Sequence, residues 1–128
     1  MSDLISEKLT RFLADYIDSI AELEAILFLR QYPNRSWSCR LVAEWIYLSE
    51  EDTASLLAKL TKKGLITANK MSPASFQYRP HDQEVAQLLD QLAEAYAKYL
   101  VPITNLIHKK SRRNIESLAD AFKFKKEP

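Results

Sequence analysis

The sequence predicts a mainly helical domain with one short β-hairpin, and three observations favour this class. Apolar residues recur at helical spacing over most of the 128-residue chain. A turn-rich tetrapeptide at 71–74 separates two short strand candidates, at 65–70 and 75–79. The only glycine, Gly64, directly follows a helical pattern, as expected for a left-handed residue that ends a helix.

The N-terminal part of the chain predicts two helices, at 3–17 and about 20–31. The first carries one apolar stripe, spaced four, three and four residues apart: Ile5, Leu9, Phe12 and Tyr16. In the second, Ser19 and Glu22 have the spacing of a capping box ahead of an apolar run. Because that run is apolar on most sides, the second helix is expected at the centre of the core.

Two shorter helices are expected at 39–48 and about 50–63, with Ser38 and Ser49 as their N-caps. The first should pack through four apolar side chains: Leu41, Val42, Trp45 and Ile46. The second should bury one face, made of Thr53, Leu56, Leu57 and Leu60. The opposite face should present five residues to solvent: Glu51, Ser55, Ala58, Lys59 and Lys62.

A long helix is expected over 83–107, with Asp82 as its N-cap. Its apolar residues have the alternating spacing of a heptad seam: Val85, Leu89, Leu92, Tyr96, Tyr99, Ile103 and Leu106. Pro102 falls inside this pattern and predicts a kink or break near 98–102. The seam and the stripe of the first helix are typical of a dimer interface, but the seam is equally compatible with packing inside one chain against residues 5–16.

Charge is unevenly distributed, although the net charge of the whole chain is only +1. Residues 1–64 hold 8 Lys/Arg and 10 Asp/Glu, a net of −2, and residues 65–107 hold 3 and 4, a net of −1. Residues 108–128 hold 7 and 3, a net of +4. Apolar positions at helical spacing also predict a short helix in this basic extension: Ile115, Leu118, Ala119 and Phe122.

The order of these elements resembles that of the winged helix-turn-helix transcriptional regulators of the MarR and PadR type. The resemblance covers roughly residues 20–100. Its most specific part begins at Leu48-Ser49 and ends with Lys62-Lys63-Gly64-Leu65-Ile66. That ending is common to winged helices in general, so it supports the fold more strongly than any single family.

The resemblance implies a winged-helix domain over 1–107, followed by the basic extension. The helix-turn-helix would lie at about 38–64, its recognition helix at about 50–63 and the wing at about 65–79. The chain would then be a DNA-binding transcriptional regulator. It would also form a homodimer through its terminal helices, at 3–17 and in the heptad seam.

In that geometry ten residues are candidates for DNA contact: Ser38, Arg40, Ser49, Thr53, Ser55, Lys59, Lys62, Lys63, Lys70 and Arg79. Three carboxylates, Glu50, Glu51 and Asp52, begin the same recognition helix. They stabilise the helix through its dipole, but they would repel DNA phosphates in the groove. The alternative function is therefore a protein–protein interaction module that has lost DNA reading and binds a basic partner through these carboxylates.

No catalytic, cofactor or metal site is expected, and hence no enzyme. A single glycine excludes a glycine-rich phosphate loop, and His81 with Glu84 supplies too few ligands for a structural metal. Cys39, the only cysteine, is expected as a small core residue in a reducing, cytoplasmic environment. No apolar run approaches the roughly 20 residues of a membrane span.

Overall fold

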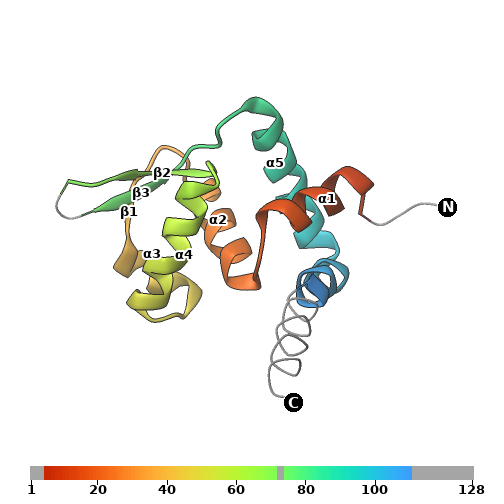
Figure 1. Cartoon of the computed structure of the whole chain (residues 1–128), viewed down its shortest axis with the longest axis horizontal. Helices are drawn as coiled ribbons and strands as arrows, with labels where there is room; N and C mark the ends of the chain where they lie inside the picture. The colour runs from red at the N-terminus through yellow and green to blue at the C-terminus, as the bar shows by residue number, and fades with distance from the viewer. Residues whose placement is uncertain (1–4, 72–73, 111–128) are drawn as a thin grey trace, which may run out of the picture.

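The computed structural model describes residues 5–71 and 74–110. This part is mainly helical and contains one three-stranded antiparallel sheet, which is compatible with a winged helix and confirms the predicted mainly helical class (Figure 1). The elements are α1 (Glu7–Tyr16), α2 (Ile20–Gln31), β1 (Trp37–Ser38), α3 (Cys39–Ile46), α4 (Glu50–Lys62), β2 (Ile66–Asn69), β3 (Ser75–Tyr78) and α5 (Gln83–Lys98). A further helical segment covers 100–110.

Each of α1–α5 begins at a residue whose side-chain oxygen accepts a hydrogen bond from the backbone N–H three residues later. These N-caps are Ser6, Ser19, Ser38, Ser49 and Asp82. Such a bond satisfies one of the N–H groups that the first turn leaves without a helical partner. The four caps predicted from the sequence are confirmed, and Ser6 adds a fifth.

The sheet has the strand order β1-β3-β2. The predicted hairpin is confirmed: β2 and β3 pair in an antiparallel register from Ile66 opposite Tyr78 to Asn69 opposite Ser75. The sequence did not predict β1, which pairs Trp37 with Phe76. Two residues are too few to show the alternation by which a strand is recognised.

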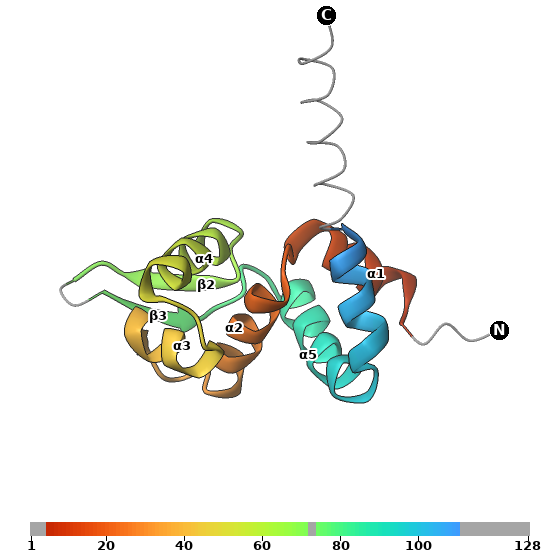
Figure 2. The same cartoon turned by 90° about the horizontal axis from the view of Figure 1, so that it is seen from below.

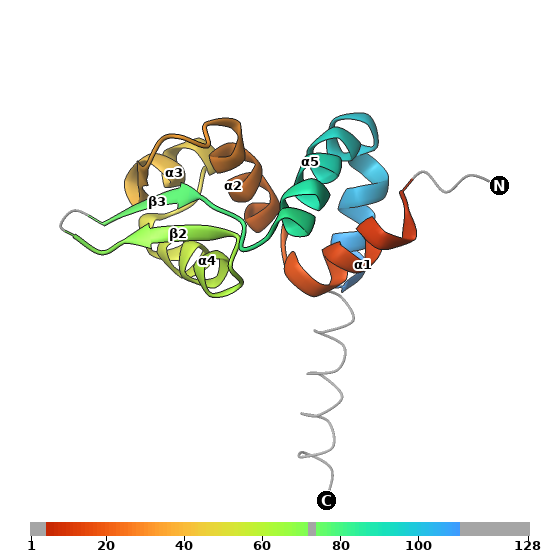
Figure 3. The ribbon, with the colours of Figure 1, turned by 90° about the horizontal axis from the view of Figure 1, so that it is seen from above.

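Two groups of elements lie side by side in all three overall views (Figures 1 to 3). One group contains α2, α3, α4 and the sheet, and the other contains α1, α5 and the helix at 100–110. The buried apolar residues form one cluster across both groups, so they share a single core. Within the described residues, no helix is both long and apolar enough to cross a membrane.

The chain breaks at Tyr99, inside the predicted break region, and the helix at 100–110 turns back alongside α5 (Figure 2). The N–H of Ile103 donates to Tyr99 O at 3.1 Å, which places Pro102 in the first turn of the new helix. Proline is tolerated there because first-turn N–H groups have no partner within the helix. The long helix predicted over 83–107, with its kink or break near 98–102, is therefore a helical hairpin with the break at Tyr99.

This hairpin also corrects the predicted dimer interface, because its seam is filled inside one chain. Seven of the assigned side chains are buried: Ile5, Leu9, Phe12, Val85, Leu89, Leu92 and Ile103. The other four are partly buried: Tyr16, Tyr96, Tyr99 and Leu106. The structure therefore matches the alternative in which the seam packs within the chain.

Gly64 ends α4 as predicted, in the left-handed conformation with φ of +79°. The N–H of Leu65 donates to Leu60 O and the N–H of Gly64 to Thr61 O, which together form a Schellman motif. A Cβ on Gly64 would lie 2.8 Å from the His81 ring. Both the backbone angle and this close approach therefore require glycine.

Four charged side chains connect the two groups of elements, and we call them the junction network: Asp18, Glu22, Lys63 and Lys110. Lys63 Nζ lies 2.8 Å from Glu22 Oε1 and 3.0 Å from Asp18 Oδ2, and it also donates to Tyr16 O at 2.7 Å. The Glu22 side chain is only 4% exposed. Lys63 therefore neutralises a buried carboxylate and fixes the end of α4 against the link between α1 and α2.

Lys110 completes the junction network from the helix at 100–110. Its Nζ lies 2.7 Å from Asp18 Oδ1 and also donates to the carbonyl oxygens of Ala14 and Ile17. These carbonyls lie at the C-terminal end of α1, where the helix dipole favours a positive charge. The hydrogen bond from Lys110, more than that from Lys63, lowers the pKa of Asp18 from 3.8 to about 2.

The adjacent residues Lys62 and Lys63 provide a matched test of the junction network. Lys63→Met should lower the free energy of unfolding by about 3 kcal/mol, because it leaves the Glu22 carboxylate buried without a counter-charge. Lys62 is exposed, so Lys62→Met should change stability by no more than about 0.5 kcal/mol. Urea denaturation measures both. Adding Glu22→Leu to Lys63→Met should recover most of the loss, and equal effects of the two single substitutions would contradict this account.

The Asp18 contribution should depend on pH. A carboxylate whose pKa is lower in the folded state stabilises the fold above its unfolded pKa, and the effect disappears as pH falls through the folded value. Because the Asp18 side chain is 44% exposed, screening reduces the expected effect of Asp18→Asn to about 1 kcal/mol at pH 7.

The difference between wild type and Asp18→Asn should stay constant from about pH 8 to 5 and shrink between about pH 4.5 and 2. Urea denaturation across this range measures it. Asp15→Asn is the control, because Asp15 is exposed on the last turn of α1. A pH-independent difference for Asp18→Asn would refute the assigned cause.

Candidate functional site

The outward face of α4 is the candidate nucleic-acid interface. All five side chains predicted on this face are exposed, and the predicted inner face of Thr53, Leu56, Leu57 and Leu60 is buried. Figures 1 and 3 show the β2–β3 hairpin projecting beyond α3 and α4. The helix therefore presents one continuous face to solvent, next to a projecting hairpin.

Seven of the ten predicted DNA-contact residues are exposed to solvent: Arg40, Ser49, Ser55, Lys59, Lys62, Lys70 and Arg79. Ser55, Lys59 and Lys62 follow one another at helical spacing along α4. Lys70 and Arg79 lie just beyond the ends of β2 and β3. Arg40 is less available for DNA contact than these residues, since its Nε lies 4.0 Å from Glu44 Oε1.

Four of the predicted contacts need correction because their polar groups serve the fold. The hydroxyls of Ser38 and Ser49 accept hydrogen bonds from the backbone N–H groups of Leu41 and Asp52, so both hydroxyls serve as N-caps. Lys63 belongs to the junction network. Thr53 is completely buried, and its hydroxyl has no hydrogen-bond partner among the described residues. Thr53 and Lys63 are thus engaged inside the fold, whereas Ser49 remains exposed beside its capping role.

The start of α4 carries negative charge that is open to solvent. Glu50, Glu51 and Asp52 are all exposed in the first turn. Over residues 38–62 the exposed charges are three cations (Arg40, Lys59 and Lys62) and four carboxylates (Glu44 and these three), a net of −1. The charge along α4 therefore changes from negative at its start to positive at its end.

An aromatic cluster beside α3 is the main feature that was not predicted from the sequence. The ring centroid of Phe28 lies 4.7 Å from that of Trp37 and 4.8 Å from that of Trp45, and the Tyr32 ring packs at the edge of Phe28. Trp45 was predicted in the core with Leu41, but it is 56% exposed and Leu41 is 39% exposed. Val42, predicted on the inner face of α3, is buried there as expected together with Ala43, and Ile46 is partly buried against the core.

Tyr47, the residue after α3, combines an unusual backbone conformation with a highly exposed side chain. Its backbone is left-handed, with φ of 59° and ψ of 45°, and its side chain is 93% exposed. Among L-residues this conformation is uncommon outside asparagine and aspartate, and it costs roughly 1 kcal/mol or more. Since the chain turns sharply here between α3 and α4, glycine or asparagine would meet the backbone requirement with less strain.

The Cys39 thiol does not have the surroundings of a nucleophile. It donates to Glu50 O at 3.3 Å and thereby joins the start of α3 to the start of α4. Burial, and secondarily the charge of Glu50, raise the pKa of this thiol above its ordinary value. Cys39 therefore stays protonated at neutral pH, whereas reactive cysteines have a lowered pKa.

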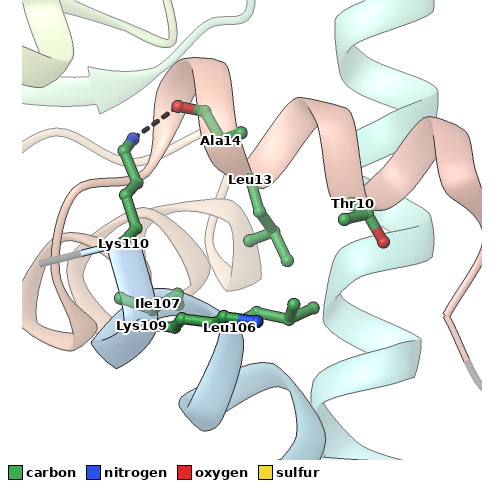
Figure 4. A pocket seen from close by; sticks show the side chains of 7 residues that line it. All are labelled: Thr10, Leu13, Ala14, Leu106, Ile107, Lys109 and Lys110. Carbon is green, nitrogen blue, oxygen red and sulfur yellow. Dashed lines mark hydrogen bonds between the residues drawn. The ribbon is translucent and has the colours of Figure 1, made fainter. Parts of the chain in front are cut away.

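Two of the cavities in the described part of the chain border α1, and neither has an arrangement that defines a reaction. One, of about 310 Å³, lies between α1 and the helix at 100–110, with Leu13, Leu106 and Ile107 among its apolar walls and Lys110 at its edge (Figure 4). The other, of about 340 Å³, includes Tyr16 and His81. No group of three or more His, Cys, Asp or Glu in the described ranges is arranged to hold a metal ion.

No family model, no curated protein and no solved structure matches this chain. The case for any function therefore depends on the residues themselves and on their arrangement.

Proposed function

We propose that this chain is a winged-helix DNA-binding protein that regulates transcription. The observation that supports this most is the outward face of α4, where Ser55, Lys59 and Lys62 lie at helical spacing. A helix of about 13 residues with one free face has the size and shape that the major groove accepts. In this proposal α4 enters the groove, and the β2–β3 hairpin serves as the wing against the DNA backbone.

The charge gradient along α4 specifies how the helix would dock. Lys59 and Lys62 lie in its last turns, and Lys70 and Arg79 border the hairpin. These cations favour phosphate contacts at the C-terminal end of α4 and at the wing. The carboxylates of the first turn would be repelled by phosphates, so we propose that this end of α4 tilts away from the DNA backbone.

A small set of basic contacts limits the affinity that this interface can reach. Each neutralised phosphate contributes about 0.9 to the slope of log K against log salt concentration. With Arg40 paired to Glu44 and Lys63 inside the junction network, four of the candidate cations in the described part of the chain remain available: Lys59, Lys62, Lys70 and Arg79. We therefore expect modest binding at low salt, with a slope of about 3 to 4.

Fluorescence anisotropy with a pool of random-sequence duplex DNA tests this function. Lys59→Ala and Lys62→Ala should each weaken binding and reduce the salt slope by about 1, because each removes one phosphate contact. Lys98→Ala is the matched control, since Lys98 is an exposed lysine on α5 that should not contact DNA.

The Lys98→Ala protein should bind like the wild type at every salt concentration. If wild-type protein does not bind at low salt, or if all three lysine variants bind alike, α4 is not the DNA-contacting helix.

A further inference from the structure

We call the exposed side chains at the end of α2, on the outer side of α3, at the turn after α3 and at the start of α4 the aromatic–acidic surface. Its exposed apolar side chains are Tyr32, Leu41, Trp45 and Tyr47, and its exposed carboxylates are Glu44, Glu50, Glu51 and Asp52. The hydrogen bond from Cys39 to Glu50 O holds the two helix starts together. This surface is separate from the lysines at the other end of α4.

The aromatic part of this surface is supported from one side and incompletely covered. Phe28 is buried and supports the rings of Tyr32 and Trp45 from beneath, so the exposed rings are held in place. Trp and Tyr are enriched at the centres of protein interfaces, because they bury a large area at a small cost in side-chain entropy. A supported but exposed Trp45 therefore indicates a contact site for another polypeptide.

Tyr47 provides an independent indication of a partner. Its left-handed backbone is strained, and its side chain, 93% exposed, gains almost no burial within the described fold. Strained residues of this kind are concentrated at functional positions. A partner that covered the Tyr47 ring would explain why a tyrosine occupies this turn.

The chain itself contains a segment with the complementary chemistry, residues 111–128. This segment holds five Lys/Arg and three Asp/Glu, a net of +2, and lies outside the described residues. Its sequence combines an apolar stripe with a final run of two phenylalanines and three lysines: Phe122-Lys123-Phe124-Lys125-Lys126. Phenylalanine rings suit the exposed Trp45 and Tyr47, and the lysines suit the carboxylates.

We propose that residues 111–128 of one copy bind the aromatic–acidic surface of a second copy, and that two copies exchange these segments reciprocally. Lys110 is held at the end of α1, in the group of elements opposite α3 (Figures 1 and 4). Lys110, the last described residue before 111–128, thus lies on the side away from the aromatic–acidic surface of its own chain. Reciprocal exchange gives a two-fold dimer with two identical contacts.

Substitutions that reverse the charges of the aromatic–acidic surface or of residues 111–128 test the proposal on the full-length chain. Light scattering and sedimentation at micromolar concentration should show a dimer for the wild type. Glu50→Lys/Glu51→Lys and, separately, Lys125→Glu/Lys126→Glu should each raise the dimer dissociation constant at least about tenfold, because like charges then face each other.

Mixing these two variants is the decisive step. In a mixed dimer, residues 111–128 of the Glu50→Lys/Glu51→Lys variant keep their lysines and meet the unchanged acidic surface of the other variant. The glutamates of the Lys125→Glu/Lys126→Glu variant meet the new lysines on the surface of the first. The mixture should therefore dimerise although neither variant does so alone. If the mixture stays monomeric while the four substitutions combined in one chain restore wild-type behaviour, the tail binds its own chain and the exchange is refuted.

Two controls separate this effect from misfolding and from general charge. Glu84→Lys/Glu94→Lys makes the same charge change on exposed positions of α5 and should leave the dimer intact. Trp45→Ser should dissociate the dimer while circular dichroism stays that of the wild type, because Trp45 is largely exposed. A wild-type chain that remains monomeric at about 100 μM would overturn the proposal, since such an interface should reach at least micromolar affinity.

Discussion

The pairing of Lys63 with the buried Glu22 is the interaction on which the arrangement of this molecule depends. It fixes the end of α4 to the start of α2, and Asp18 and Lys110 extend the contact to α1 and to the helix at 100–110. Removing either charge would leave the other in a low-dielectric environment, so the pair holds only one geometry. The direction in which α4 presents its outer face, and hence any interface there, follows from this internal contact.

The sequence identified the helices well because their signals are local. The serine and aspartate caps, the lone glycine and Pro102 each act within one turn of the backbone, so their neighbours suffice to place them. Lys63 was misassigned for the opposite reason: it lies at the C-cap of α4, where helical periodicity no longer tells which way a side chain points. Its partners, at positions 18 and 22, are distant in sequence.

Apolar periodicity also has a limit, because it shows that a face is covered without showing by what. The heptad seam of α5 fitted a dimer and a single chain equally, and the return of the chain after Tyr99 resolved this in favour of internal packing. The pattern failed differently for Trp45, which is spaced from Leu41 like a core residue but lies on the outer side of α3. A helix of eight residues is short enough that apolar side chains occur on both of its faces.

Two features of the charge distribution are unfavourable when each is considered alone. The carboxylates at the start of α4 oppose approach to DNA, and residues 108–128 concentrate a net charge of +4 at one end of the sequence. If the extension of a second copy binds at the start of α4, its lysines neutralise those carboxylates and add positive charge beside Lys59 and Lys62. Dimer formation would then reduce the repulsion that weakens DNA binding by a single chain, so the two proposals are coupled energetically although each rests on different residues.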